Sequence, residues 1–124
     1  STHLVALSLA DAWSADDVVP PITPYYVMKV GHVPMIPYRR PGDPAVAGLV
    51  AQAIARQRAR GAAIRAVLLE RLGPNVWHRS PAEAMATLEE LEEMAKLWLM
   101  TKPRPAPLSD AQIEELRVHF DARW

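Results

Sequence analysis

Apolar residues recur at helical spacing in four parts of the chain, and this pattern predicts four helices. The first would cover residues 2–10. The second would begin after Asp43, a predicted N-cap that places Pro44 at the first helical position, and would stop at Gly61. The residues expected to face inward are Leu4, Val5 and Leu9 in the first helix and Val46, Leu49, Val50 and Ile54 in the second.

The two later helices have clearer starting signals. Ser80 followed by Glu83 predicts a capping box before a helix that runs to about Met100. Ser109 followed by Gln112 predicts another capping box before a final helix. The residues expected to face inward are Ala84, Met85, Leu88, Leu91, Met94, Ala95 and Trp98 in the longer helix and Ile113, Leu116 and Phe120 in the last one.

Four short segments between the helices predict strands. Residues 25–31 (YYVMKVG) and 33–38 (VPMIPY) lie in a proline-rich region, where proline favours extended backbone and restricts a strand to the edge of a sheet. Residues 63–70 (AIRAVLLE) are a continuous apolar run, and residues 73–78 (GPNVWH) predict its continuation or partner. Helices and strands together predict an α/β domain in which helices cover a sheet.

Composition narrows the classes of protein to consider. A chain of 124 residues, half of them apolar, predicts one domain over residues 1–124. Lys and Arg (14) balance Asp and Glu (14), so we expect neither nucleic acid nor a membrane as partner. No cysteine is present, which excludes a disulfide framework, a thiolate metal site and a cysteine nucleophile. The absence of cysteine fits a reducing cytoplasm, and no basic residue precedes the apolar N-terminal segment as in a signal peptide, so a cytoplasmic protein is expected.

The candidate chemical groups favour structural interpretations when they are taken from the residues alone. The histidines at positions 3, 32, 78 and 119 lack the spacing with which one helix or strand presents two ligands to a metal, although a site built from distant histidines stays open. The acidic run EELEE at 89–93 predicts a solvated helix face. The arginines at 56, 58 and 60 suit the last turn of a helix.

Several longer stretches take the interpretation further. "STHLVALS", "PPITPYYVMKVGHVPMIPYRRPGDPAVA", "AVLLERLGPNVWH" and "ATLEELEEMAKLW" follow one another in this order and extend over nearly all of the chain. In spelling and spacing they resemble the C-terminal part of the class II aldolase/adducin family. Within that family, the resemblance is to the branch of sugar-acid phosphate decarboxylases and sugar-phosphate aldolases.

This resemblance implies a partial α/β/α layered fold, with a mainly antiparallel sheet flanked by helices. It also implies a homo-oligomer with active sites between subunits. In the family a divalent metal, usually zinc, is held by three histidines and polarises the substrate carbonyl while a carbon–carbon bond breaks. A small sugar-acid phosphate would be the substrate of a complete parent protein.

The chain departs from the family pattern at the metal site. Two of the three histidines form an H-x-H pair that would precede Ser1, and His3 follows that pair. The third falls at Leu72 when "ERLGP" is aligned with the family's "ANHGP". A catalytic zinc needs about three protein donors, so we predict no metal site in this chain. The resemblance also implies a proton-donating tyrosine at Tyr25, with Tyr26 as the alternative and an ordinary strand tyrosine as the structural interpretation.

We therefore predict a class II aldolase-like protein that is not catalytic as this chain alone and acts as an assembly or interaction module, with no cofactor. The alternative is that the chain is part of a metal-dependent sugar-phosphate aldolase or decarboxylase. In that case the missing ligands and the acid/base glutamate of the family would come from a longer parent chain.

Overall fold

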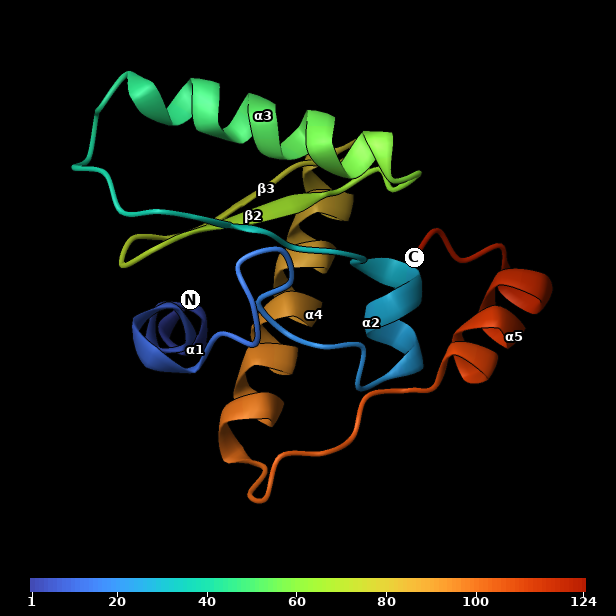
Figure 1. Ribbon diagram of the computed structural model, residues 1–124. Helices are drawn as coiled ribbons and strands as arrows, with labels where there is room; N and C mark the ends of the chain where they lie inside the picture. Colours follow the sequence, from blue (N-terminus) through green and yellow to red (C-terminus); the bar gives the residue numbers. More distant parts are fainter.

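The computed structural model describes all 124 residues and contains six helical segments and three strands (Figure 1). None of the helices combines the length and apolar character that crossing a bilayer requires. In chain order the elements are α1 (Thr2–Ala6), the π-helical turn η1 (Leu7–Asp11), α2 (Pro24–Lys29), β1 (Met35–Ile36), α3 (Ala45–Ala59), β2 (Ala66–Leu69), β3 (Gly73–Val76), α4 (Pro81–Met100) and α5 (Asp110–Phe120).

The sheet is mixed, so the prediction of a mainly antiparallel sheet is only partly right for this chain. Its strand order is β1-β2-β3, with β1 parallel to β2 and β2 antiparallel to β3. The directions follow from the connections. A three-residue turn joins β2 to β3, as an antiparallel hairpin allows, whereas β1 reaches β2 through α3, a crossover that returns the chain in the same direction. The predicted edge position of residues 33–38 is confirmed, although only Met35 and Ile36 form a strand.

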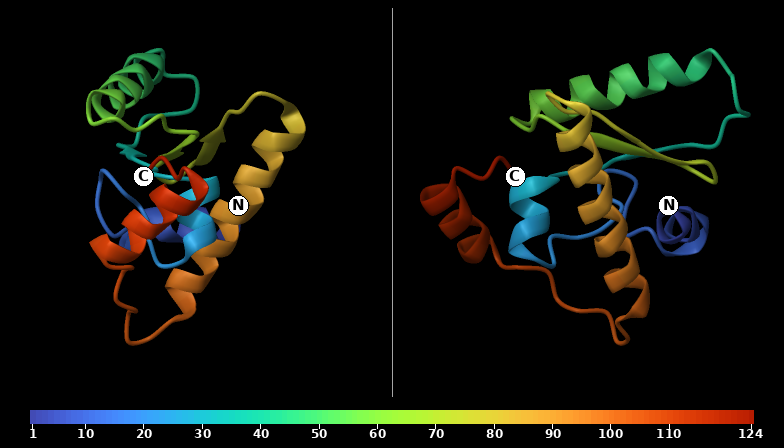
Figure 2. Two further views of the ribbon diagram at one scale, coloured as in Figure 1. Left: turned by 90° about the vertical axis from the view of Figure 1, so that its right-hand side faces the viewer. Right: turned by 180° about the vertical axis from the view of Figure 1, so that it is seen from behind.

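Side chains of β2 alternate between two apolar clusters on opposite faces of the sheet. Val67 packs with Ile36 and Ala53 on the face that α3 covers. Ala66 and Leu68 point into the larger cluster on the other side. That cluster also contains Leu4 and Leu7 of the N-terminal segment, Tyr26 of α2 and Leu91, Met94, Ala95 and Trp98 of α4. Figure 2 shows α3 and α4 on opposite sides of the strands.

The predicted strand at residues 25–31 is wrong, because Pro24–Lys29 form helix α2. The local signals for this helix are a cap and a proline. The Thr23 hydroxyl accepts a hydrogen bond from the Tyr26 N–H at 3.2 Å, and Pro24 occupies the first turn, where its missing N–H costs nothing. These signals outweigh the β-forming character of the two tyrosines and the valine, which are only weak preferences.

The other helices are confirmed with small changes at their ends. Helix α3 begins at Ala45, one residue later than predicted, and Asp43 still accepts a hydrogen bond from the Ala45 N–H at 2.9 Å. Ser109 and Gln112 form the complete capping box of α5. Ser80 caps α4 by accepting from the Glu83 N–H, without the reciprocal bond to its own N–H. Three residues expected to face inward are instead exposed, namely Leu9, Met85 and Phe120.

Candidate functional site

The turn between β2 and β3 holds the residue that the sequence singled out. Leu72 lies in this turn with its side chain 40% exposed, and its N–H donates to the Leu69 carbonyl at 3.0 Å. Arg71 before it has a φ of 68°, in the left-handed region that side chains other than glycine and asparagine rarely adopt. The turn therefore presents a hydrocarbon side chain at the surface from a tightly shaped backbone.

The same turn is fixed to the beginning of the chain. The Arg71 N–H donates to the Ser8 hydroxyl at 3.0 Å, and that hydroxyl donates to the Val5 carbonyl at 2.7 Å. Ser8 is buried, and its hydroxyl makes both of these hydrogen bonds, as a buried polar side chain requires. The turn that contains Leu72 therefore lies beside α1 and η1, and Figure 1 shows the tip of the hairpin above them.

The His3 side chain is not available as a metal ligand through its Nδ1, because this atom pairs with Glu92 of α4. The His3 Nδ1 lies 2.8 Å from the Glu92 Oε2, and the two oxygens of this carboxylate also accept the backbone N–H groups of His3 and Leu4, each at 3.1 Å. Burial alone would raise the pKa of Glu92, but these hydrogen bonds outweigh it and lower the pKa below its usual value.

Glu92 thus caps the first turn of α1. This overturns part of the prediction for residues 89–93, whose acidic side chains were all expected to lie on a solvated helix face. The caps of α1 had no visible signal in the sequence, since the acceptor lies on another helix, 88 and 89 positions away from the donors.

The two candidate tyrosines differ completely in exposure. Tyr25 is 59% exposed, with the Lys29 ammonium 5.1 Å from the centre of its ring. Tyr26 is fully buried, and its hydroxyl has no hydrogen-bond partner. Burial, reinforced by the negative charge of Asp17, raises the pKa of Tyr26 far above its usual value. Of the two, only Tyr25 is placed where it can reach a molecule outside its own chain.

Tyr25 and Leu72 are not brought together within one chain. Helix α2 packs against α4 and α5, and in Figures 1 and 2 it lies at the other end of the strands from the β2–β3 turn. A site that used both positions would therefore need two copies of the chain.

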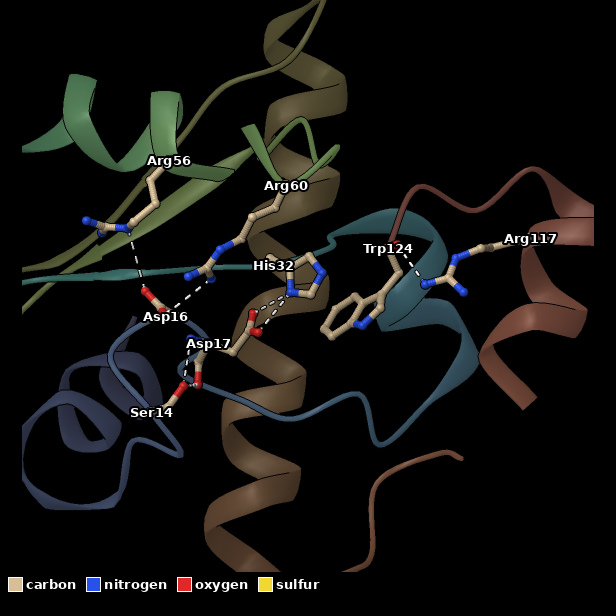
Figure 3. Close-up of polar contacts among 8 residues, drawn as sticks. All are labelled: Ser14, Asp16, Asp17, His32, Arg56, Arg60, Arg117 and Trp124. Atoms are coloured by element: carbon tan, nitrogen blue, oxygen red, sulfur yellow. Dashed lines mark hydrogen bonds and ion pairs between the residues drawn. The ribbon is translucent and has the colours of Figure 1, made fainter. Parts of the chain in front are cut away.

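A cluster that the sequence did not suggest joins the segment after η1 to the C-terminus (Figure 3). The Asp17 carboxylate lies 2.8 Å from the His32 Nδ1, and both side chains are largely buried. The Trp124 ring stacks on the His32 ring with 3.7 Å between their centres, and Arg117 donates to the Trp124 carbonyl oxygen at 3.0 Å. No periodicity links residues so far apart in the sequence, so reasoning from the sequence could not find this cluster.

Beside this cluster, Asp16 lies within ion-pair distance of two arginines, Arg56 in α3 and Arg60 at its C-cap (Figure 3). Its carboxylate oxygens are 3.7 Å from the Arg56 Nε and 3.4 Å from the Arg60 Nη1. The sequence predicted that these arginines complement the helix dipole, and the structure adds a specific carboxylate partner for two of them. All three side chains are about half exposed, so we expect these pairs to add little stability.

The four histidines lie in four separate places. His3 pairs with Glu92, His32 with Asp17, and His78 lies 3.3 Å from Glu83, while His119 is exposed on α5. No three side chains of the histidine, cysteine, aspartate or glutamate type come close enough to share a metal ion. The residues of this chain therefore do not fit a three-histidine metal centre.

A family described as "Class II Aldolase and Adducin N-terminal domain" matches residues 1–99. The chain is 58% identical, over its full length, to the 3-oxo-tetronate 4-phosphate decarboxylase of Cupriavidus necator, and it covers 56% of that relative. It is 41% identical to the protein of the same name from Escherichia coli K12, with 94% of this chain and 52% of the relative covered. The chain thus spans about half the length of the curated relatives it matches.

Two solved structures are also similar to this chain over about half of their own length. The crystal structure of YgbL from Escherichia coli, described as a putative aldolase/epimerase/decarboxylase, superposes with a TM-score of 0.79 at 39% sequence identity and covers 94% of this chain. Its counterpart from Klebsiella pneumoniae gives a TM-score of 0.74 at the same identity. This chain covers 54% of each of those two chains.

Proposed function

This chain belongs to the class II aldolase and adducin family, and from that premise we propose that it is a class II aldolase-like module that does not cleave carbon–carbon bonds on its own. The resemblance inferred from the sequence is confirmed at the level of the family. The matched domain is described as N-terminal, so the chain is not a separate C-terminal domain of the family. Its placement in the later part of that one domain is part of our proposal.

The observation that carries the proposal is Leu72. The turn after β2 brings this residue to the surface beside α1, where the alignment with "ANHGP" would place a metal-binding imidazole. A leucine offers no electron pair, and a catalytic zinc needs about three protein ligands. Members of the family are generally dependent on a divalent metal, but the donors present here do not fit one.

Tyr25 is the residue through which we propose that this chain contributes to a site. Its exposure, and its position on α2, which lies at the other end of the strands from the β2–β3 turn (Figure 1), support a role toward a neighbouring subunit. In an assembly of chains that carry the complete family domain, this phenol hydroxyl could donate a proton to a leaving carbon or oxygen in the neighbour's site. This proposal includes a homo-oligomer, the α/β/α layering of a complete family domain, and a cytoplasmic location.

The second candidate function is that the chain is part of a metal-dependent sugar-phosphate decarboxylase or aldolase. The names of the relatives favour it, since several are 3-oxo-tetronate 4-phosphate decarboxylases and the chain covers only about half of each. In this case the H-x-H pair and the acid/base glutamate would come from the half that is not represented here, and Leu72 would still leave the metal site one ligand short.

A chimera would test the role that both alternatives give to Leu72. The half of the Escherichia coli decarboxylase that this chain does not match would be joined to this chain, with either Leu72 or Leu72→His, and decarboxylation of 3-oxo-tetronate 4-phosphate would be followed by release of carbon dioxide. We expect turnover only with Leu72→His, because three ligands are then present. Equal turnover with Leu72 would refute the role given to this position.

The role of Tyr25 can be measured in the same chimera. Tyr25→Phe should lower kcat by about 10²-fold, the lower end of what a positioned general acid contributes. The matched control is Tyr38→Phe, which removes the hydroxyl of another exposed tyrosine and should leave kcat unchanged. Equal losses from both substitutions would contradict the proposed role of Tyr25.

A further inference from the structure

A pocket of about 530 Å³ opens between α2, the segment before β2, the segment after β3 and the C-terminal residues. Its size is within the range of small-molecule sites. It lies at the start of β2, whereas the turn that holds Leu72 follows the end of β2, so the two are at opposite ends of this strand. The pocket is therefore separate from the turn that holds Leu72, and it shares helix α2 with Tyr25, which is not among its lining residues.

The floor of the pocket is apolar, whereas most of its accessible lining is polar. Val27 and Val30 of α2 and Ile64 before β2 form this floor, and each is almost fully buried. The accessible apolar surface therefore comes from the less buried Met28 and Ala63. Phe120 also lines the pocket, with most of its ring exposed. A large aromatic side chain in this position adds surface against which the apolar part of a ligand can pack.

The polar lining is mainly cationic. Three arginines, Arg65, Arg79 and Arg123, line the same pocket as a single carboxylate, that of Asp121. Asp121 lies 3.4 Å from the Arg123 guanidinium in a strongly exposed pair, which is too weak to hold either group firmly. Two positive charges therefore remain without a carboxylate partner in the pocket.

Arg65 and Arg79 both keep donors available. The Arg65 Nη1 donates to the Lys29 carbonyl at 2.8 Å, which fixes its guanidinium against the end of α2 and leaves its other N–H groups free. Arg79 uses its backbone N–H for a bond to the His78 Nδ1 at 2.8 Å, and its guanidinium forms no ion pair. Guanidinium groups are suited to planar or tetrahedral oxyanions, which they bind through paired N–H donors.

We propose that this pocket binds a small organic anion with an apolar body, such as an aromatic or aliphatic carboxylate, sulfonate or phosphate ester. The apolar part would lie on the exposed Phe120 ring and beside Met28 and Ala63, and the oxyanion would face Arg65 and Arg79. A sugar-acid phosphate lacks the apolar body that this surface fits, so the ligand class differs from the substrates named for the relatives. The proposal does not depend on the function proposed above.

The test uses the whole chain and three probes, which differ in whether they carry an aromatic ring, a negative charge or both. Naphthalene-1-sulfonate carries both the ring and the charge, 1-naphthalenemethanol carries the ring alone, and inorganic phosphate carries charge alone. Binding would be measured by titration with detection of amide chemical shifts. We expect the sulfonate to bind at least about tenfold more tightly than either other probe, with shifts centred on Gly31, Ile64 and Asp121.

Arg79→Ala tests the cationic part, since this exposed residue can be changed without opening the core. It should weaken binding of the sulfonate about tenfold, the effect of losing about one hydrogen bond to a charged group. Arg58→Ala, an exposed arginine of α3 outside the pocket, is the matched control and should leave binding unchanged. Equal affinity for the sulfonate and the alcohol, shifts centred elsewhere, or no effect of Arg79→Ala would overturn the proposal.

Discussion

Replacing Glu92 should destabilise the N-terminal part of this chain. Glu92 lies on a long, charged helix, where the loss of one carboxylate would otherwise be expected to have little effect on stability. Its carboxylate accepts two backbone N–H groups, those of His3 and Leu4, and the His3 ring, across the interface between α1 and α4. Leu4 is fully buried in the main cluster. The cap therefore holds in place a helix that supplies part of the core.

The magnitude follows from what the carboxylate binds. Losing a side-chain cap costs about 1 kcal/mol, and hydrogen bonds to a charged group contribute about 1.5–3 kcal/mol each where water cannot replace them. The Glu92 side chain is 23% exposed, so water replaces part of the loss. We expect Glu92→Ala to lower the free energy of unfolding by about 2 kcal/mol, and Glu92→Gln by about 1 kcal/mol because one oxygen remains.

The assay is urea unfolding followed by far-ultraviolet circular dichroism, with Glu89→Ala as the matched control. Glu89 is exposed on the same helix and makes no hydrogen bond with its side chain, so its loss removes the same charge and should change the free energy of unfolding by less than about 0.5 kcal/mol. If both alanine variants unfold at the same urea concentration, the capping role of Glu92 is refuted.

The same contact should make stability depend on pH. Since hydrogen bonding lowers the pKa of Glu92 in the folded state, its contribution is present above the ordinary pKa of glutamate, about 4.3, and is lost as the pH falls through the lower folded value. The difference in the free energy of unfolding between the unmodified chain and Glu92→Gln should therefore become smaller below about pH 4. A difference that stays constant down to pH 3 would contradict this account.

Three further substitutions test other parts of the structure by the same unfolding assay. Tyr26→Phe removes a buried hydroxyl that has no partner, so it should be neutral or raise the free energy of unfolding by up to about 1 kcal/mol; a loss above about 1 kcal/mol would show that the hydroxyl is bonded. Arg71→Gly should stabilise by about 1 kcal/mol, because φ is 68° there, and a loss of stability would contradict that backbone shape. Trp124→Ala should destabilise by about 2 kcal/mol through loss of the ring on His32, whereas Trp13→Ala, on an exposed ring, should cost under about 1 kcal/mol.

The elements that could be predicted are those whose signals are local. The hairpin of β2 and β3 follows from an apolar run, a short turn and a second strand, and α5 begins at a complete capping box. Helix α2 shows where such signals compete. Two adjacent tyrosines and a valine favour a strand, and only the cap at Thr23 and the proline after it indicate the helix that forms.

The direction of β1 could not be read from its residues. Whether two strands run parallel depends on the path of the chain between them, here a helix of 15 residues that crosses back over the sheet. The resemblance to a family gave a mainly antiparallel sheet, and this part of the domain contains a parallel pair as well.

For the candidate site, the sequence identified which residues to consider, but it did not show what those residues contact. Leu72 was placed in a turn after a buried strand, and the structure adds that Ser8 fixes this turn to the first helices. The choice between Tyr25 and Tyr26 required the packing of this segment, because one step along the chain turns the side chain from solvent into the core. The contacts of Glu92 and of Trp124 join distant segments, and no local pattern encodes them.

The central claim is that this chain alone lacks the metal-dependent chemistry of its family, and metal content tests it most directly. The purified chain would be incubated with zinc or manganese, freed of unbound metal by gel filtration and analysed by mass spectrometry for metal per chain. We predict far less than one ion per chain, both for the unmodified chain and for Leu72→His, since neither provides three ligands. One tightly bound ion per unmodified chain would contradict the account.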